Sequence, residues 1–210
     1  MSSTTTYRTI TRRCVGELEV SRSRFLADVR RVESEDAARA VIAEIRAEHR
    51  DARHHCSAFV LGPDGRLQRS NDDGEPSGTA GAPILAALGG AGLSDVVAVV
   101  TRWFGGTLLG TGGLTRAYGG AVDAALRDAR FVIREEREAV DVAVPHADAG
   151  RIEAELRARG VDVAGTDYTE VATLHLTTTD PDALDAHIAA LTGGTAVGIR
   201  NGPRWHDIDG

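Results

Sequence analysis

The sequence predicts an α+β protein with two domains, and three observations lead to this prediction. The chain has 210 residues and is 42% apolar, which is enough to bury one large core or two smaller ones. Residues 1–134 carry 18 Arg and 16 acidic side chains, a net charge of +2, whereas residues 135–210 carry 6 and 15, a net charge of −9. Each part also has its own strand and helix patterns, so we expect a flexible N-terminus at 1–14, a first domain at 15–134 and a second at 138–204.

The first part starts with two segments in which apolar and polar side chains alternate, as they do in half-buried strands. These segments predict a hairpin, and an amphipathic helix with Ser34 as its N-cap follows. A Pro-Asp-Gly turn then predicts a second hairpin, after which come a short helix, a buried strand, a glycine-rich loop and a last helix. In order, the expected strands and helices are 14–20, 24–32, 34–49, 56–62, 67–70, 82–88, 95–101 and 114–129.

The second part repeats a simpler pattern of short strands and two helices. The expected segments are 139–145, 147–160, 161–168, 171–178, 180–191 and 195–201. Their order, β-α-β-β-α-β, is that of the split β-α-β or ferredoxin-like fold. No cofactor motif is visible in this part of the chain.

The glycine-rich stretch 101–120 follows a buried strand and precedes a helix, an arrangement that can hold phosphate on backbone N–H groups. It is not a nucleotide P-loop, because Thr111 and Gly112 stand where that motif needs Lys and Ser or Thr, and the chain has no Lys. It is not a dinucleotide-binding motif, because Thr115 occupies the last glycine position. We therefore expect no cofactor.

Two interpretations of this stretch stay open. In the first, the glycines allow positive φ and close backbone approach in a crowded loop, with Trp103 and Phe104 filling the core. In the second, Trp103 together with Arg102 and Arg116 forms a surface on which a base or a peptide side chain stacks.

The acidic loop at 70–85 also has two interpretations. Asp72, Asp73 and Glu75 offer oxygen ligands to a divalent metal ion, with His54 as a further ligand, but they lack the spacing of an EF-hand. Alternatively, these carboxylates accept hydrogen bonds from loop N–H groups at the start of the helix that follows Gly78 and Thr79. We favour the helix-start interpretation.

The "RHHCS" segment brings two histidines and a cysteine together and raises the question of a Cys/His nucleophile. Successive residues of a strand point to opposite faces, so His54 and Cys56 share a face, whereas His55 and Cys56 do not. Because unpaired Cys is commonly buried, we expect Cys56 to be an unreactive core residue.

The cysteines and the lengths of the apolar runs indicate the cellular compartment in which the protein is found. Cys14 and Cys56 lie 42 positions apart without a metal-binding spacing, which favours a reducing compartment. The longest apolar runs are about five residues, far short of the roughly 18 that span a membrane, and the first residues lack the apolar segment of a secretory signal. We expect a cytoplasmic protein without membrane association, and the oligomeric state stays open.

Three segments, 51–61, 70–85 and 99–122, resemble the YigZ/IMPACT family in sequence, order and spacing. Arg24, His55, Ala82 and Trp103 stand where Lys, Asn, Lys and Tyr are usual in that family. The resemblance implies that the first domain is similar to the second domain of ribosomal protein S5. It implies that the second domain is similar to domain V of elongation factor G, which is ferredoxin-like. Eukaryotic relatives act in translational control.

These observations together favour a non-catalytic cytosolic binding module associated with translation. Its partner would be RNA, the ribosome or a translation-associated protein, held in a groove of the first domain. The alternative is a small metal-dependent hydrolase that uses Asp72, Asp73, Glu75 and His54. The expected ligand-binding residues are Asp72, Asp73, Glu75, Ser77, Gly78, Thr79, Gly81, Arg102, Trp103, Gly105, Gly106, Gly112, Gly113, Arg116 and Tyr118.

Overall fold

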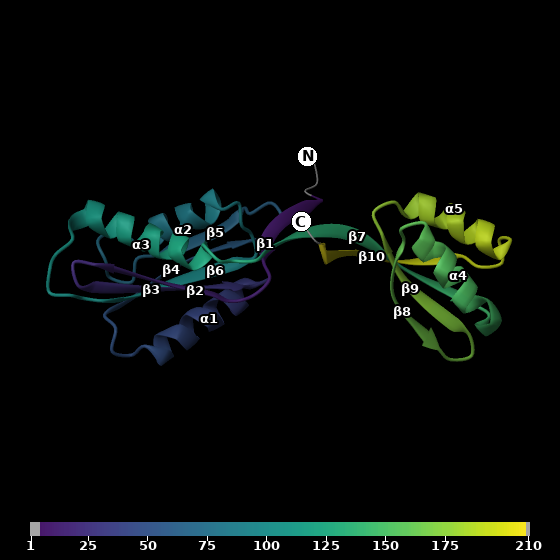
Figure 1. Ribbon diagram of the computed structural model, residues 1–210, viewed down its shortest axis with the longest axis horizontal. Coiled ribbons are helices and arrows are strands. Elements are labelled where there is room, and N and C mark those ends of the chain that lie inside the picture. The colour runs from purple at the N-terminus through teal and green to yellow at the C-terminus, as the bar shows by residue number, and fades with distance from the viewer. Residues whose placement is uncertain (1–4, 209–210) are drawn as a thin grey trace. The chain divides into compact units, whose positions relative to one another are not determined.

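A computed structural model describes residues 5–208 of the chain (Figure 1). Contacts divide these residues into two compact units: unit 1 runs to Arg134 and includes Ile208, and unit 2 is Glu135–Asp207. Within the described range, the helices are all too short or too polar to cross a lipid bilayer.

Unit 1 is built on an antiparallel five-stranded sheet with the order β2-β3-β6-β4-β5. The strands are β2 (Cys14–Val20), β3 (Ser23–Arg31), β4 (His54–Leu61), β5 (Leu67–Asn71) and β6 (Val96–Trp103). The central strand β6 is buried from Val96 to Arg102 because helices cover both of its faces, and this explains its unbroken apolar run. The edge strand β5, by contrast, is exposed from Gln68 to Asn71.

Three helices cover the sheet of unit 1. Helix α1 (Glu35–Glu48) packs on one face, and α2 (Gly81–Gly90) and α3 (Gly110–Leu126) pack on the other (Figure 1). The alternation of β4 sorts its side chains between two cores, because Phe59 faces α1 whereas Ala58 and Val60 face α2 and α3. The predicted N-cap of α1 is confirmed, since the Ser34 hydroxyl accepts the N–H of Ala37 at 3.1 Å.

Unit 2 has the predicted β-α-β-β-α-β order and is ferredoxin-like. Its elements are β7 (Phe131–Val144, which begins in unit 1), α4 (His146–Ala158), β8 (Asp162–Tyr168), β9 (Ala172–Thr178), α5 (Pro181–Thr192) and β10 (Gly198–Ile208). The strand order is β10-β7-β9-β8, and α4 and α5 lie on one face (Figure 1). Val142 and Leu174, from neighbouring strands, pack with Ile152 and Ile188 of the two helices in its core.

Several boundaries differ from the sequence-based expectation. Residues 6–10, expected to belong to a flexible N-terminus, form strand β1 (Thr6–Ile10), which pairs with β7, while residues 1–4 lie outside the described residues. The β-favouring Tyr7 and Ile10 are buried there, so burial orders a segment whose polar composition suggests fraying. Helix α3 starts at Gly110, four residues earlier than expected, because its glycines join the first turn.

The contact between β2 and α3 leaves no room for a side chain at Gly16. A Cβ atom there would lie 2.2 Å from the backbone nitrogen of Ala125, whereas one at Gly119 would lie 3.7 Å from its nearest neighbour. We therefore expect Gly16→Ala to lower the stability of unit 1 by about 1–3 kcal/mol, the usual cost of overpacking, and Gly119→Ala to leave it unchanged or raised.

Urea unfolding followed by Trp103 fluorescence measures this difference in a Trp205→Phe background, which removes the other tryptophan. Equal stability of the two glycine variants would show that β2 and α3 separate easily.

Candidate functional site

Four connections meet at one end of the sheet in unit 1. The register places Arg24 opposite Trp103, Arg102 opposite His54, and Ser57 opposite Asn71. The turn 21–22 and the connections 49–53, 72–80 and 104–109 therefore extend from the same end, and we call these four segments the loop end. The acidic loop and the glycine-rich stretch, which are far apart in sequence, both belong to it.

Asp72 holds the start of α2. Its carboxylate accepts the backbone N–H groups of Gly78 at 2.8 Å, Ala80 at 3.0 Å and Gly81 at 2.8 Å. Burial alone would raise the pKa of Asp72, but the three N–H donors outweigh it and place the pKa below its usual value. The helix-start interpretation describes these contacts. Asp72 thus occupies the N–H groups of Gly78 and Gly81, two of the residues expected to bind a ligand.

Asp73 also binds within the chain. Its side chain accepts the guanidinium of Arg46 at 2.7 Å and the backbone N–H of His55 at 2.6 Å. Its φ of +45° is left-handed, a conformation that Asp tolerates better than most residues, and the side chain of Asn71 accepts its N–H at 2.6 Å. The carboxylate thus joins α1 to β4.

Glu75 is the most enclosed of the three acids, with a side chain that is 4% exposed. Its Oε1 accepts Arg102 Nη1 at 2.5 Å and the hydroxyl of Tyr118 at 2.8 Å. The ring of Tyr118 in turn packs edge-on against Phe25. Glu75, Arg102 and Tyr118, all predicted to bind a ligand, therefore bind one another between the acidic loop, β6 and α3.

The Cys56 thiol is buried and lacks a catalytic partner. It donates to the carbonyl oxygen of Asp72 at 3.0 Å, and burial raises its pKa to about 12. His54 lies on the same side of β4, as expected, but its Nδ1 is 2.8 Å from the carbonyl oxygen of Asp73. His55 points to the other face, where its Nε2 is 3.0 Å from the carbonyl oxygen of His49. Both cysteines are free and buried.

The acidic residues of the loop do not form a set of metal ligands with His54. In the part of the chain from residue 5 to 208, no three His, Cys, Asp or Glu side chains gather as a group that could hold a metal ion. The carboxylates of Asp72, Asp73 and Glu75 are directed at separate donors, which are backbone N–H groups, Arg46 and Arg102 respectively.

The aromatic residues of the loop end are more accessible than its acids. Phe104 is 41% exposed, so the interpretation that places it in the core does not hold, and the guanidinium of Arg53 lies 5.6 Å from its ring centre. The Trp103 ring is partly exposed, with the guanidinium of Arg24 4.7 Å from its centre, and its Nε1 donates to Asp51 at 2.8 Å. Each of these two accessible rings therefore has a guanidinium group beside it.

The glycines of the loop end serve different purposes. A Cβ at Gly105 would lie 2.0 Å from the backbone of Arg22, so this position needs glycine for close approach. Gly106 has a φ of +88°, which disfavours any β-branched residue. Gly112 and Gly113 lie in the first turn of α3, which has no side-chain cap and no acidic residue.

The remaining predicted residues divide between the inside and the surface. Thr79 is buried and its hydroxyl donates to the carbonyl oxygen of Pro76 at 2.6 Å, and Gly81 abuts the backbone of Asn71. Ser77 and Arg116 are exposed.

Sequence reasoning missed four accessible groups at the loop end. Arg22, Arg50 and Arg53 are exposed, and Leu108 is 88% exposed. None of these arginines, nor Arg116, pairs with a carboxylate among the described residues. The signal that could have identified them is their place in turns beside the two motifs, since turn side chains usually reach solvent.

Comparison with known proteins agrees with the motifs. Residues 21–126 match the Impact N-terminal domain, and residues 142–195 match a domain of unknown function, DUF1949. The chain is 53% identical to IMPACT family member YigZ of Escherichia coli over 111 residues, which are 52% of this chain and 54% of the relative. It is 44% identical to IMPACT family member YvyE of Bacillus subtilis over 141 residues, 67% of this chain and 65% of the relative.

A solved structure supports the same fold. The crystal structure of a hypothetical protein, 34% identical in sequence, superimposes with a TM-score of 0.66 over 93% of this chain and 97% of that one. The alignments with YigZ and YvyE span about half and about two thirds of those relatives.

Because Glu75 and Arg102 are paired and buried, we predict that removing the Arg102 guanidinium greatly lowers the stability of unit 1. In Arg102→Met the stem is kept, but Glu75 is left buried without its positive partner, so we expect a loss of about 3–5 kcal/mol in the stability of unit 1. Arg116→Ala, at an exposed position, should change stability by less than about 0.5 kcal/mol.

Urea unfolding of both variants tests this expectation. Adding Glu75→Gln to Arg102→Met should restore part of the loss, because the uncompensated charge is removed. Similar stability of Arg102→Met and the unaltered chain would mean that Glu75 reaches solvent or another donor.

Because His55 is buried, we predict that the stability of unit 1 depends on pH. Burial lowers the pKa of His55 below its ordinary value of 6.5, so the unfolded chain takes up this proton at a higher pH than the folded chain. Its contribution is complete above about pH 6.5 and is lost as the pH falls toward the folded pKa. His55→Asn should therefore reduce the loss of stability between pH 7.5 and 5.5, by at most about 1.4 kcal/mol, because pH 5.5 lies one unit below the ordinary pKa.

His175→Asn serves as the opposite case in the same unfolding measurements. Hydrogen bonds to Asp141 and Asp167 raise the pKa of His175, so its contribution is full at low pH and is lost as the pH rises. An identical pH profile for His55→Asn and the unaltered chain would contradict the buried, neutral state of His55.

Proposed function

The chain belongs to the IMPACT family, and from this premise we propose that it is a binding module that holds single-stranded RNA at the loop end of unit 1. Membership of the family does not identify a ligand for this chain, so the choice of RNA depends on the chemistry of the exposed side chains. A place in translation or its regulation, in the cytoplasm, is part of the proposal and comes from the family resemblance alone.

The observation that carries the proposal is the mixture of free cations and accessible rings at the loop end. Arg22, Arg50, Arg53 and Arg116 are exposed and have no carboxylate partner among the described residues. Phe104 is 41% exposed beside Arg53. Guanidinium groups bind phosphates, and aromatic rings stack on bases whatever the sequence, so this combination suits a flexible single strand.

Binding is favoured over catalysis because the reactive groups of the loop end are used internally. The thiol of Cys56 is buried with its pKa raised to about 12, so it supplies no thiolate near neutral pH. Asp72 and Glu75 accept hydrogen bonds from the chain itself. The alternative of a metal-dependent hydrolase has no supporting observation at these residues.

The charge of the chain is consistent with RNA meeting unit 1 and not unit 2. Residues 1–134 have a net charge of +2 and residues 135–210 a net charge of −9, so the second part repels a polyanion. The acidic unit therefore works against non-specific binding along its own surface and leaves the exposed arginines of the loop end as the attractive region.

Fluorescence anisotropy with a labelled ribonucleotide strand of about 12 nucleotides tests the proposal on the full chain. Phe104→Ala should weaken binding by about 1–3 kcal/mol, the usual value of one base stacked on an aromatic ring, with the salt dependence unchanged. Arg53→Gln should weaken binding and reduce the slope of log K against log salt by about 0.7, the loss of one phosphate contact on a single strand.

Arg66→Gln is the matched control, because Arg66 is exposed in the β4–β5 turn at the opposite end of the sheet. It changes the net charge as Arg53→Gln does but removes no expected contact. Equal binding of Arg53→Gln and Arg66→Gln, or no RNA binding by the unaltered chain at low salt, would refute this function and favour a protein partner.

A further inference from the structure

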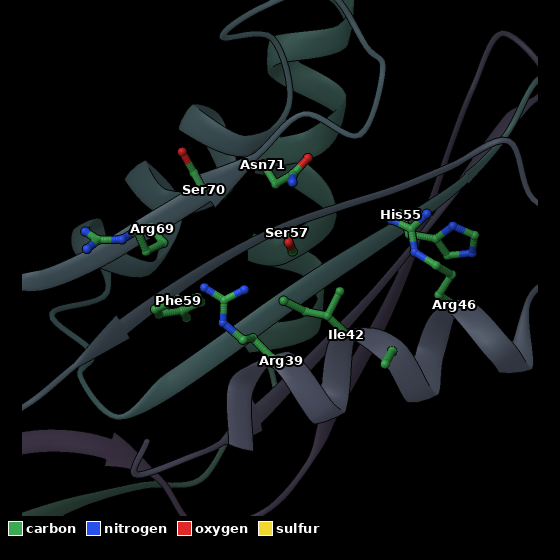
Figure 2. Close-up of a pocket in the computed structure, with 10 residues that line it drawn as sticks. Arg39, Ile42, Arg46, His55, Ser57, Phe59, Arg69, Ser70 and Asn71 are labelled. Carbon is green, nitrogen blue, oxygen red and sulfur yellow. The ribbon is translucent and has the colours of Figure 1, made fainter. Parts of the chain in front are cut away.

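A pocket lies in unit 1 between α1 and the strands β4 and β5, and one end of it, at Arg46, His55 and Asn71, adjoins the loop end. Its volume is about 460 Å³, within the range of pockets that take small molecules. Figure 2 shows Ser57 in the middle, with Arg39 and Arg69 near Phe59 and Arg46 near His55. The arginines of this pocket differ from those of the proposed RNA surface, which are Arg22, Arg50, Arg53 and Arg116.

The fold leaves this hollow because α1 does not reach the edge of the sheet. The buried face of α1, which includes Ala38 and Ile45, packs on Phe59 of β4 and on β6. The adjacent stripe of the helix, Arg39, Ile42 and Arg46, is spaced at i, i+3 and i+7 and lines the pocket instead. The strand β5 then forms the opposite wall.

Positive charge dominates the lining of the pocket. Three guanidinium groups and no carboxylate line it. Arg46 is already neutralised by Asp73 at 2.7 Å, and Arg39 is paired with the partly exposed Glu35 at 2.5 Å. Arg69 donates only to the carbonyl oxygen of Gln68 at 3.0 Å and has no carboxylate partner within residues 5–208. The end formed by Arg39 and Arg69 is therefore the one that attracts an anion.

Uncharged polar groups lie beside these arginines. Ser57 is 5% exposed, and its hydroxyl makes no hydrogen bond to any described residue. The side-chain oxygen of Asn71 accepts the N–H of Asp73, which leaves its amide NH2 group as a donor. The apolar side chains of Phe59 and Ile42 complete the lining. A ligand here meets cations at one end, hydrogen-bonding groups in the middle and an apolar floor.

We propose that this pocket binds a small organic phosphate of about mononucleotide size. The phosphate group binds Arg39 and Arg69, and the polar body of the ligand reaches Ser57 and Asn71. Guanidinium groups match phosphate oxygens in geometry and charge, and a phosphate readily replaces Glu35 because that pair is solvent-exposed and weak. His55 stays neutral near pH 7, because burial lowers its pKa, and adds no charge.

Isothermal titration calorimetry of the full chain tests the pocket with a defined panel. The probes are the four ribonucleoside 5′-monophosphates, ribose 5-phosphate, glucose 6-phosphate, inorganic phosphate, adenosine, and an RNA strand without a terminal phosphate. At least one organic phosphate should bind more tightly than inorganic phosphate, and adenosine should not bind. Arg69→Gln should weaken that binding at least about tenfold, which corresponds to one lost charge-assisted contact.

Two further variants make the result specific to the pocket. Arg66→Gln removes an equal charge from the same hairpin outside the pocket and should leave the affinity unchanged. Ser57→Ala should lower the affinity with no change in melting temperature, because its hydroxyl has no partner in the chain.

The proposal is overturned if no organic phosphate binds at millimolar concentration, or if Arg66→Gln weakens binding as much as Arg69→Gln. Binding of the RNA strand alone, lost in Arg69→Gln, would overturn it as well and would assign the pocket to the RNA path. The two proposals stay distinguishable because Phe104 and Arg53, the residues changed to test the loop end, do not line the pocket.

Discussion

The buried carboxylate of Glu75 is the interaction on which the loop end depends. One oxygen accepts both the guanidinium of Arg102 and the hydroxyl of Tyr118, so a single charge joins the acidic loop to the sheet and to α3. The Arg102 guanidinium lies 5.4 Å from the ring centre of Phe25 and is almost as enclosed as the acid. Because neither charge reaches water freely, the three elements hold their relative positions together or lose them together.

The parts of this fold that sequence predicted are the local ones. The hairpin of β2 and β3, the cap at Ser34 and the order of elements in unit 2 follow from periodicity and turn residues over short stretches. What escaped prediction depends on distant contacts. Strand β1 forms by pairing with β7 over 100 residues later, and Glu75 binds Arg102, 27 residues ahead of it, and Tyr118. Neither pairing leaves a periodic trace in the sequence.

The acidic loop and the glycine-rich stretch come together at the loop end, but several of their charged side chains bind within the chain. Charged residues of the two motifs, such as Asp72 and Arg102, look like ligand contacts in sequence because nothing local shows where they point. Packing turns them inward, and it leaves Phe104, for which a place in the core was one of two open interpretations, exposed. Side-chain direction in a loop is decided by the loops around it, so the gathering of Arg22 and Arg53 at one end of the sheet became visible only in the fold.

The polar edge of the sheet has a consequence for how copies of this protein behave toward one another. A strand at the edge of a sheet has unpaired backbone groups that can template further strands and lead to aggregation. In β5 the exposed residues are Gln68, Arg69, Ser70 and Asn71, and across the sheet β2 exposes Glu17 and Glu19 together with Val15. Two copies that approached through like edges would bring like charges together or bury polar side chains. We therefore expect the charged and polar residues at both edges of unit 1 to oppose sheet-to-sheet association in concentrated solutions.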